Sequence, residues 1–360
     1  MDREAQIVVL GAGVVGLTTA LQLARSGYKN VAVVSKYFAG DSHPEYTSRW
    51  AAVNFHPVSK EGSEAAQWDK ESWPELYKLA KDVPAAGVKL SNNTSYFRNK
   101  DRPRDQYNDW WSNLVLDHRI LRDDEIPPFA DWGIAFCSIA LDPPIYLHYL
   151  QSTCLALGVK FHRASVDHIR DAFSLDVSSA FPHPELVVNC TGVWSAKLGG
   201  VTDSKIMPVR GQIVLVENDS HGEWALSGDD DMAPRIGECC YIVPRPSGGG
   251  TALGGCRHIG WSTEPDMALA ERIMKRAIKV CPKLVPPGAG IEALRVVRHQ
   301  VGLRPLRMGG PRIEMETLPD GGEKVVHCYG AGGFGFQSSY GMANKAVRLV
   351  GESLATKARL

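Results

Sequence analysis

The chain has 360 residues, 44% hydrophobic and 22% charged, which is enough apolar content for one large core or two domains of ordinary size. Lys+Arg and Asp+Glu number 40 each, and a net charge of zero argues against a nucleic-acid-binding or polybasic membrane-binding protein. The apolar runs are too short for a membrane helix or a signal peptide. Eight irregularly spaced cysteines without a CxxC pair predict free thiols and no metal site. We therefore expect a soluble intracellular protein.

The N-terminal segment has the order strand, glycine turn, helix, strand. Residues 7–10 form a β-branched run that predicts a buried parallel strand. Apolar residues then recur at helical spacing over 17–24, and Gly27 is placed to end that helix. Residues 31–34 predict the next buried strand. The pattern is that of a βαβ unit.

The turn of this unit reads GAGVVG and predicts a dinucleotide site. Gly11 permits the tight turn, Gly13 lets the backbone approach a pyrophosphate, and Gly16 lets the helix pack on the strand. The start of the helix would face the phosphates with free N–H groups. The predicted cofactor contacts here are Gly11, Ala12, Gly13, Val14, Val15 and Gly16. A glycine-rich turn without a ligand is the alternative.

The end of the second strand departs from the usual dinucleotide pattern. An acidic residue commonly binds a ribose hydroxyl there. This chain has Ser35 and Lys36 instead, which can still contact a ribose and a phosphate. The departure weakens an NAD interpretation more than a flavin one.

The rest of the chain is mixed. Residues 56–140 are rich in Trp, Pro and Asn and predict part of a second, antiparallel domain with long connections. Residues 186–192 return to the pattern of a buried strand followed by glycine. Strands predicted over 208–216, 241–244 and 251–255 suggest an antiparallel sheet that walls a pocket.

A second glycine turn lies near the C-terminus. A strand over 325–330 runs into a Gly-rich segment over 331–337, and a helix follows from about 339 to 355. Two glycine turns that each open a helix can converge on one long cofactor, and FAD is long enough to need both. The first would hold the pyrophosphate, and the second would lie near the isoalloxazine ring.

Seven motifs, in this order, resemble the D-amino-acid oxidase family of flavoproteins. They are GAGVVG at 11–16, TSRWAA at 47–52, NCTG at 189–192, PVRGQ at 208–212, YIVPRP at 241–246, HQVGLRP at 299–305 and HCYGAGGFGFQSSYG at 327–341. The resemblance implies an FAD-dependent oxidase that converts a D-amino acid, water and O₂ into a 2-oxo acid, ammonia and hydrogen peroxide. Hydride transfer from the substrate Cα to flavin N5 would need no acid or base catalyst.

The resemblance also implies the architecture. We expect an α/β protein with a Rossmann-like FAD-binding domain and an α+β substrate domain that has a large antiparallel or mixed sheet. The FAD-binding domain would be discontinuous and comprise 1–55, 145–204 and 290–360. The substrate-binding domain would comprise 56–144 and 205–289.

Site residues follow by position in the motifs. Flavin contacts would be Ser35, Lys36, Thr47, Ser48, Ala51, Ala52, Asn54, Val166, Thr191, Gly192, Arg304, Gly332, Gly333, Gly335, Phe336 and Gln337. Arg304 matches the arginine that holds the substrate α-carboxylate, and a bidentate guanidinium would orient the Cα hydrogen. Tyr241 would help to hold the same carboxylate, and Gly333 would face the substrate. A structural arginine and a sheet tyrosine are the alternatives.

One position departs from the motif of the broad-specificity family members and points toward acidic substrates. Arg257, in Gly-Gly-Cys-Arg, resembles the D-aspartate oxidase branch, in which a cation meets the substrate side-chain carboxylate. His56 would add a polar donor. A buried arginine without an anion is costly, so such a site could reject neutral substrates by roughly 10⁴. An exposed arginine at a strand end and a core histidine are the alternatives, and Arg235 is a further candidate cation.

Three functions remain open from the sequence. A D-aspartate oxidase is the leading one, with D-Asp as its main substrate and D-Glu and N-methyl-D-Asp as further candidates. A D-amino-acid oxidase for neutral substrates and a flavin-binding protein without oxidase activity are the others. The C-terminal Ala358-Arg359-Leu360 resembles the Ser-Lys-Leu peroxisomal address, which predicts binding to the peroxisomal import receptor; the cytoplasm is the alternative location. A homo-oligomer is compatible with the sequence.

Overall fold

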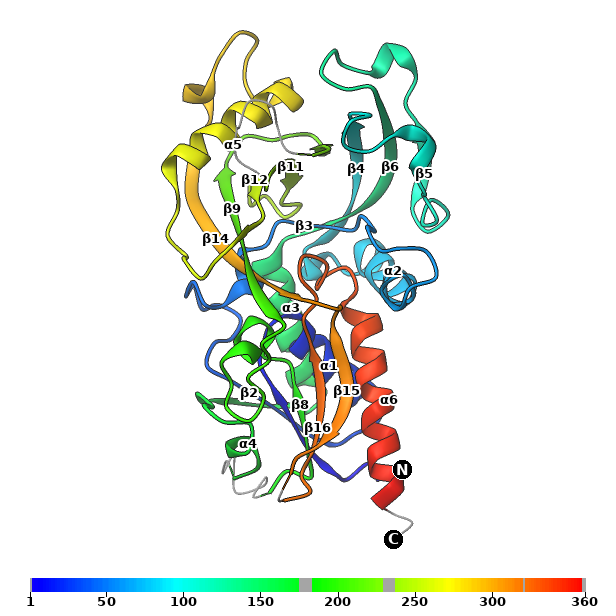
Figure 1. Cartoon of the computed structure of the whole chain (residues 1–360), viewed down its shortest axis with the longest axis vertical. Helices are drawn as coiled ribbons and strands as arrows, with labels where there is room; N and C mark the ends of the chain where they lie inside the picture. The colour runs from blue at the N-terminus through cyan, green and yellow to red at the C-terminus, as the bar shows by residue number, and fades with distance from the viewer. Residues whose placement is uncertain (1, 175–182, 229–236, 320, 358–360) are drawn as a thin grey trace.

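The computed structural model of the chain describes residues 2–174, 183–228, 237–319 and 321–357. Its strands form two sheets, one in the lower half of Figure 1 and one mainly in the upper half. Among the described residues the lower sheet has six strands in the order β15 (Arg312–Thr317), β16 (Lys324–Tyr329), β8 (Leu186–Asn189), β1 (Gln6–Leu10), β2 (Asn30–Ser35) and β7 (Lys160–Arg163). All neighbouring pairs are parallel except β15 with β16.

The predicted βαβ unit is confirmed. β1 pairs in parallel with β2, and helix α1 (Val14–Arg25) connects them. β1 is buried on both faces: Ile7 and Val9 belong to one hydrophobic cluster, and Val8 and Leu10 to another. Gly27 has a φ of 88°, the left-handed conformation expected of a residue that ends a helix.

Three helices cover one face of the lower sheet. α1 packs against α3 (Pro143–Ala156) and against α6 (Ser339–Lys357), the C-terminal helix drawn in red in Figure 1. The short helix α4 (Asp171–Ser174) contributes Ala172 to the cluster on the other face. The predicted strand, glycine turn and helix near the C-terminus are thereby confirmed as β16 and α6.

The upper sheet is large and mixed. Its order is β13 (His258–Ile259), β9 (Ile206–Val216), β12 (Thr251–Cys256), β11 (Glu238–Pro244), β10 (Glu223–Leu226), β4 (Val88–Phe97), β6 (Trp132–Leu141) and β3 (Val53–Asn54); β14 (Val296–Arg307) also pairs with β9, and β5 (Leu116–Ile120) with β6. Only β10 with β4 is parallel among the described pairs of this sheet. The expected fold class, an α/β protein with a second large mixed sheet, is confirmed.

Helix α5 (Met267–Val280) covers β9, β11 and β12. Its Leu269, Ile273 and Ala277 are fully buried in the hydrophobic cluster of this sheet. Glu238, on β11, is also buried and accepts bonds from Arg272 and from Arg276, the latter at 2.6 Å. The remaining 3₁₀ turns are η1 (Thr47–Trp50), η2 (Pro84–Ala86), η3 (Arg104–Gln106), η4 (Asp123–Glu125), η5 (Gly192–Ala196), η6 (Pro282–Leu284) and η7 (Ile291–Ala293).

The expectation of strands and long connections over 56–140 is wrong in one part. Helix α2 (Glu64–Asp82) spans 19 residues of that segment and packs on α6. Ser63 caps it by accepting a hydrogen bond from Ala66 N, and Trp68 is buried. Pro74 lies inside the helix. An interior proline normally breaks a helix, and it concealed the periodicity in the sequence.

The domain boundaries stay a prediction. Within residues 290–360, strand β14 pairs with β9 of the upper sheet from Arg298 to Arg307. The eight cysteines all lie among the described residues, and none of them forms a disulfide bond there. Within the described part of the chain, no helix combines the length and apolarity that crossing a membrane requires.

Candidate active site

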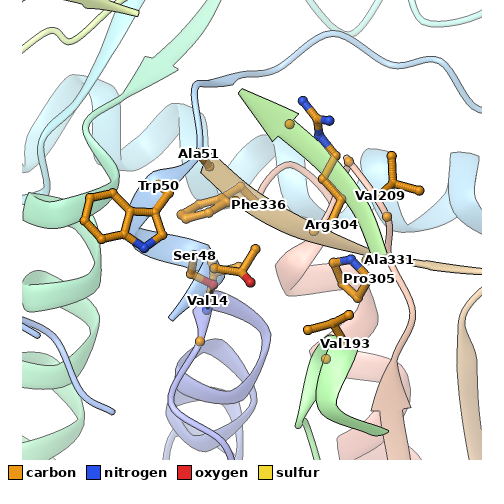
Figure 2. Close-up of a pocket in the computed structure, with 18 of the residues that line it drawn as sticks. Val14, Ser48, Trp50, Ala51, Val193, Val209, Arg304, Pro305, Ala331 and Phe336 are labelled. Carbon is orange, nitrogen blue, oxygen red and sulfur yellow. Dashed lines mark hydrogen bonds between the residues drawn. The ribbon is translucent and has the colours of Figure 1, made fainter. Parts of the chain in front are cut away.

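A cavity of about 1230 Å³ is lined by residues of both sheets. Ligand pockets usually measure about 300–1000 Å³, so this one suits a long ligand together with a small one. In the view of Figure 2, Val14 and Ser48 lie near the start of α1, Arg304 lies on β14, and Phe336 lies between them. The strands and turns that contribute these residues are far apart in the sequence.

The first glycine turn forms one end of the cavity. Tyr46 OH donates to Ala12 O at 2.7 Å, and Val14 N donates to Ser48 Oγ at 3.1 Å, which hold the segment 46–48 against the turn. A Cβ added to Gly13 would come within 2.9 Å of Ser48 Oγ. Gly16 does not line the cavity; a Cβ there would be 1.9 Å from Gly11 O, so its role is the predicted packing of helix on strand.

The second glycine turn lies directly beside the first. A Cβ on Gly335 would be 3.9 Å from Val15 Cγ2. Gly332 N donates to Pro305 O at 2.8 Å, which ties this turn to β14. The two turns are separated by more than 300 residues in the chain and meet at one cavity, as predicted for one long cofactor.

The residues present fit FAD. The absence of side chains at Gly11 and Gly13 leaves backbone open to the cavity beside the start of α1, where the helix dipole favours phosphate. The buried hydroxyl of Thr47 also lines the cavity and has no hydrogen-bond partner in the structure, as expected for a group that awaits a ligand. Ala51, Phe336 and Gln337 continue the wall toward Arg304.

The end of the cavity near β2 contains an acidic residue that the sequence did not reveal. Ser35 Oγ accepts from Ala12 N at 3.2 Å and donates to Tyr37 O. Glu45 lines the same region and accepts from Lys36 Nζ at 2.9 Å and from Tyr37 OH at 2.8 Å. Burial opposes ionisation of Glu45, but these two bonds prevail and lower its pKa. The acidic group therefore comes from the following loop and not from the end of the strand.

Arg304 and Tyr241 meet at the other end of the cavity. Arg304 Nη2 donates to Tyr241 OH at 3.1 Å, and Nη1 donates to Cys256 O at 2.8 Å. Glycines make room for both side chains, because a Cβ on Gly211 would be 2.4 Å from Arg304 Nη1 and one on Gly254 would be 2.0 Å from the Tyr241 ring. Burial raises the pKa of Tyr241 to about 12, so its hydroxyl remains a donor at neutral pH.

Arg257 lines the same cavity, but its side chain is exposed. The premise that an unpaired Arg257 would be buried is therefore wrong, because the residue follows the end of β12 and stays in contact with solvent. Its guanidinium has no hydrogen bond or ion pair with the described residues. A hydrated cation is less costly to leave unpaired, so rejection of neutral ligands should fall well below 10⁴.

His56 stands in an aromatic corner of the cavity. Its ring lies 5.1 Å from the rings of Trp111 and Phe136, and its backbone N donates to Gln337 Oε1 at 3.3 Å. Burial, with the charge of Arg102, lowers the pKa of His56 to about 4. At neutral pH it can offer one N–H as a neutral donor, but no positive charge.

The cavity brings together nearly all the residues singled out in the sequence. The residues on its wall are Gly11, Ala12, Gly13, Val14, Val15, Ser35, Lys36, Thr47, Ser48, Ala51, Ala52, Asn54, His56, Val166, Thr191, Gly192, Tyr241, Arg257, Arg304, Gly332, Gly333, Gly335, Phe336 and Gln337. Arg235 lies outside the described residues. The wall also includes Glu45 and Cys239, which belong to none of the seven motifs, and Trp50, which lies in TSRWAA but was not among the predicted contacts. Cys239 could have been found from its alternation with Tyr241 on one strand.

The fold and the cavity define a class. The parts are those of a flavin-dependent oxidoreductase that acts on a small carboxylate. They are a βαβ unit with a glycine turn, a second glycine turn beside it, and the pair of Arg304 and Tyr241 on strands of a large sheet. The sequence profile of the family described as FAD dependent oxidoreductase matches residues 6–349. The chain belongs to this family of D-amino-acid-oxidase type, and FAD is its cofactor.

The chain resembles several characterised proteins along nearly its whole length. It is 39% identical over 355 residues to a D-amino-acid oxidase of Fusarium vanettenii, covering 96% of each chain. It is 28% identical over 369 residues to a D-aspartate oxidase of Talaromyces thermophilus, covering 96% of this chain and 95% of the other. The glycine oxidase of Bacillus cereus shares the fold, with a TM-score of 0.74, 19% identity and coverage of 97% and 96%.

Proposed function

We propose that the protein is an FAD-dependent D-aspartate oxidase that deaminates acidic D-amino acids, D-aspartate first. The observation that carries this proposal is the presence of two arginines on one cavity wall. Arg304 is fixed by Tyr241 and Cys256, whereas Arg257 has a guanidinium without a partner among the described residues. Two cations match the two carboxylates of aspartate.

The chemistry requires orientation more than proton transfer. Oxidation removes a hydride from Cα and a proton from the amino group, water then hydrolyses the imine to the 2-oxo acid and ammonia, and O₂ is reduced to hydrogen peroxide. When bound, FAD supplies the hydride acceptor at its N5 and passes the electrons to O₂. Arg304 binds the α-carboxylate through its planar fork, which fixes the direction of the Cα–H bond.

The neighbours of Arg304 complete the α-carboxylate subsite. Tyr241 carries a donor that stays protonated because its pKa is raised to about 12. His56 lines the same cavity and, as a neutral ring packed against Trp111, can donate one N–H but adds no charge. This arrangement leaves Arg257 as the cation available for a side-chain carboxylate.

A D-amino-acid oxidase for neutral substrates is the second candidate. It is favoured by the 39% identity to the Fusarium D-amino-acid oxidase. In that case Arg257 would remain in solvent and contact no substrate.

The test is a substrate panel of D-Asp, D-Glu, N-methyl-D-Asp and D-Ala, measured on the wild type and on Arg257→Gln. For the proposed function we expect kcat/KM to be highest for D-Asp. The substitution should lower it for D-Asp by roughly tenfold, as for an exposed charge pair at a ligand, and leave D-Ala within a factor of about 2. Higher wild-type activity on D-Ala, or equal losses on both substrates, would instead support the neutral-substrate oxidase. Failure of every D-amino acid to bleach the flavin absorbance without O₂ would identify a flavin-binding protein without oxidase activity.

We also propose a peroxisomal location, supported by the sequence Ala358-Arg359-Leu360 and by a product, hydrogen peroxide, that this compartment handles. These residues lie outside the described part of the chain. Deleting the three residues should move a fluorescent fusion of the full chain from peroxisomes to the cytoplasm. An unchanged distribution would refute the proposal.

A further inference from the structure

Four charged side chains from four separate segments gather outside the main cavity. Arg49 lies in η1, Asp142 precedes α3, Arg245 follows β11, and Arg298 lies on β14. None of them belongs to the lining of the large cavity. They act on one another electrostatically: burial raises the pKa of Asp142 against the opposing effect of the three guanidinium groups, and Arg49 and Arg298 add to burial in lowering the pKa of Arg245.

Contacts place these residues around two points. Gly249 touches one pair, because a Cβ on it would be 2.7 Å from Asp142 Oδ2 and 3.0 Å from Arg245 Cδ. Trp50 lies beside the other pair, with the guanidinium carbons of Arg49 and Arg298 at 5.8 and 5.6 Å from the centroid of its ring. The positively charged cluster thus adjoins η1, whose Trp50 also lines the main cavity.

Four polar atoms of the cluster are buried without a hydrogen-bond partner, whereas Arg298 Nε donates to Gln300 Oε1 at 2.8 Å. Arg245 is only 7% exposed, yet its Nε and Nη2 have no hydrogen-bond partner in the structure. Arg49 Nε and Asp142 Oδ1 are likewise buried without a partner. No ion pair within 4.0 Å joins any of the four residues to another described residue. Buried guanidinium donors without acceptors are costly, so a ligand that accepts from them is the expected occupant.

We propose that Arg49, Arg245, Arg298 and Asp142 form an anion site for hydrogen phosphate, separate from the substrate and FAD sites. Three guanidinium groups and one carboxylate leave two positive charges, which match a dianion. Planar guanidinium forks suit tetrahedral oxyanions. Asp142 adds selectivity, because its Oδ1 accepts the proton that hydrogen phosphate carries and sulfate lacks.

An occupied site should strengthen FAD binding. Phosphate would immobilise η1 through Arg49, and η1 carries Ser48, which accepts from Val14 N at the first glycine turn. Two ligands that favour the same arrangement of one segment raise each other's affinity by the same factor.

The experiment uses the FAD-saturated full chain at about pH 8, where phosphate carries close to two charges. Thermal unfolding is followed while inorganic phosphate replaces chloride at constant ionic strength, with sulfate as a second titrant. We expect a saturable rise in Tm of a few degrees with phosphate, since ligands that bind only the folded protein stabilise it. Sulfate should bind at least tenfold more weakly.

Substitutions locate the site. Arg245→Gln should abolish the rise, but because Arg245 is buried, the less buried Arg49→Gln and Arg298→Gln are measured alongside it and should each weaken phosphate binding about tenfold. Arg257→Gln is the matched control, since it removes a cation from the main cavity, and it should leave phosphate binding unchanged. The proposal is overturned if the wild type shows no saturable rise, if both Arg49→Gln and Arg298→Gln keep it, if Arg257→Gln abolishes it, or if sulfate binds as well as phosphate.

Discussion

At the scale of single residues, the orientation of Arg304 is set before any substrate arrives. Arginine has five N–H donors, and two nitrogens of this one already donate to Cys256 O and Tyr241 OH. Glycines at 211 and 254 let the backbone lie close against both side chains, because any Cβ there would collide with them. A preorganised fork loses little entropy when it binds a carboxylate.

Arg304→Lys should therefore lower the catalytic efficiency strongly, although the substitution keeps the positive charge. Lysine keeps the charge but cannot form a planar pair of bonds. We expect kcat/KM for the best D-amino acid to fall roughly 30- to 5000-fold, which corresponds to a loss of about 2–5 kcal/mol in transition-state stabilisation. Steady-state kinetics at saturating O₂, normalised to bound FAD, would measure it. A loss below threefold would mean that Arg304 does not hold the carboxylate.

The buried carboxyl of Glu223 predicts a pH dependence of the protein's stability. This carboxyl is 1% exposed, accepts from Asn54 Nδ2 at 2.9 Å and from Asn93 Nδ2 at 3.0 Å, and its Oε1 has no partner. Burial raises its pKa to about 7. Between pH 4.5 and 7 the folded protein then binds more protons than the unfolded chain, so this contribution to stability is present at low pH and is lost as the pH rises through 7.

Glu223→Gln removes that dependence. Relative to the wild type, the variant should gain roughly 2–3 kcal/mol of unfolding free energy between pH 5 and pH 8, because each tenfold difference in proton affinity between the folded and unfolded protein contributes about 1.4 kcal/mol. Denaturant unfolding with excess FAD at several pH values would show it. The exposed Glu217→Gln is the control, with an expected change within about 0.5 kcal/mol at each pH. Parallel pH profiles for wild type and Glu223→Gln would contradict the prediction.

At the scale of elements, two glycines of the βαβ unit have separable roles. Gly13 has a φ of −71°, which any residue tolerates, but a Cβ there would press on Ser48 Oγ at the wall of the cavity, where the pyrophosphate is expected. Gly27 has a φ of 88° with nothing within 4 Å of its would-be Cβ. One glycine keeps space for the cofactor, and the other allows a backbone conformation.

Substitution by alanine should separate these roles. Gly13→Ala should weaken FAD binding by at least tenfold with little loss of stability in the apoprotein. Gly27→Ala should lower the stability of the apoprotein by about 1 kcal/mol and keep the affinity for FAD. Flavin fluorescence titration and apoprotein unfolding would measure the two effects. The interpretation is wrong if Gly13→Ala binds FAD normally.

Helix α2 connects the second glycine turn to the rest of the fold. Asp69, on α2, accepts from Ser338 Oγ and from Gln337 Nε2 at 3.1 Å, and Gln337 faces the cavity. Ser72, one helical turn farther on, accepts from Gly341 N at 3.0 Å. A helix that the sequence concealed therefore fixes the position of the turn expected at the flavin.

At the scale of the whole molecule, the cavity wall takes residues from both sheets, so FAD should couple them. Removing FAD should lower the unfolding free energy by the ligand's mass-action term, about 2.7 kcal/mol at a hundredfold excess over Kd. Calorimetry of apoprotein and FAD-loaded protein would show a Tm that rises with FAD concentration. A Tm independent of added FAD would show that the cofactor does not stabilise the folded protein.

Much of the fold was predictable because it depends on local patterns. Buried β-branched runs over 7–10 and 31–34 and the glycine turns after two strands specify parallel strands and helix starts without reference to distant residues. Helices α2, α3, α4 and α5 were not predicted. Pro74 interrupts the pattern of α2, and α5 belongs to a segment that was interpreted only as part of an antiparallel domain.

The sequence by itself determined the βαβ unit, the two glycine turns, the class of cofactor and the candidate arginines, because these rest on residue type and short spacing. Only the tertiary structure decided that the two turns meet, that Glu45 lines the cavity near the end of the second strand, and that Arg257 is exposed while Arg245 is buried with two guanidinium nitrogens lacking a partner. Exposure and distance between segments depend on how all elements pack. The sequence around an arginine therefore does not show whether its guanidinium will be exposed or buried.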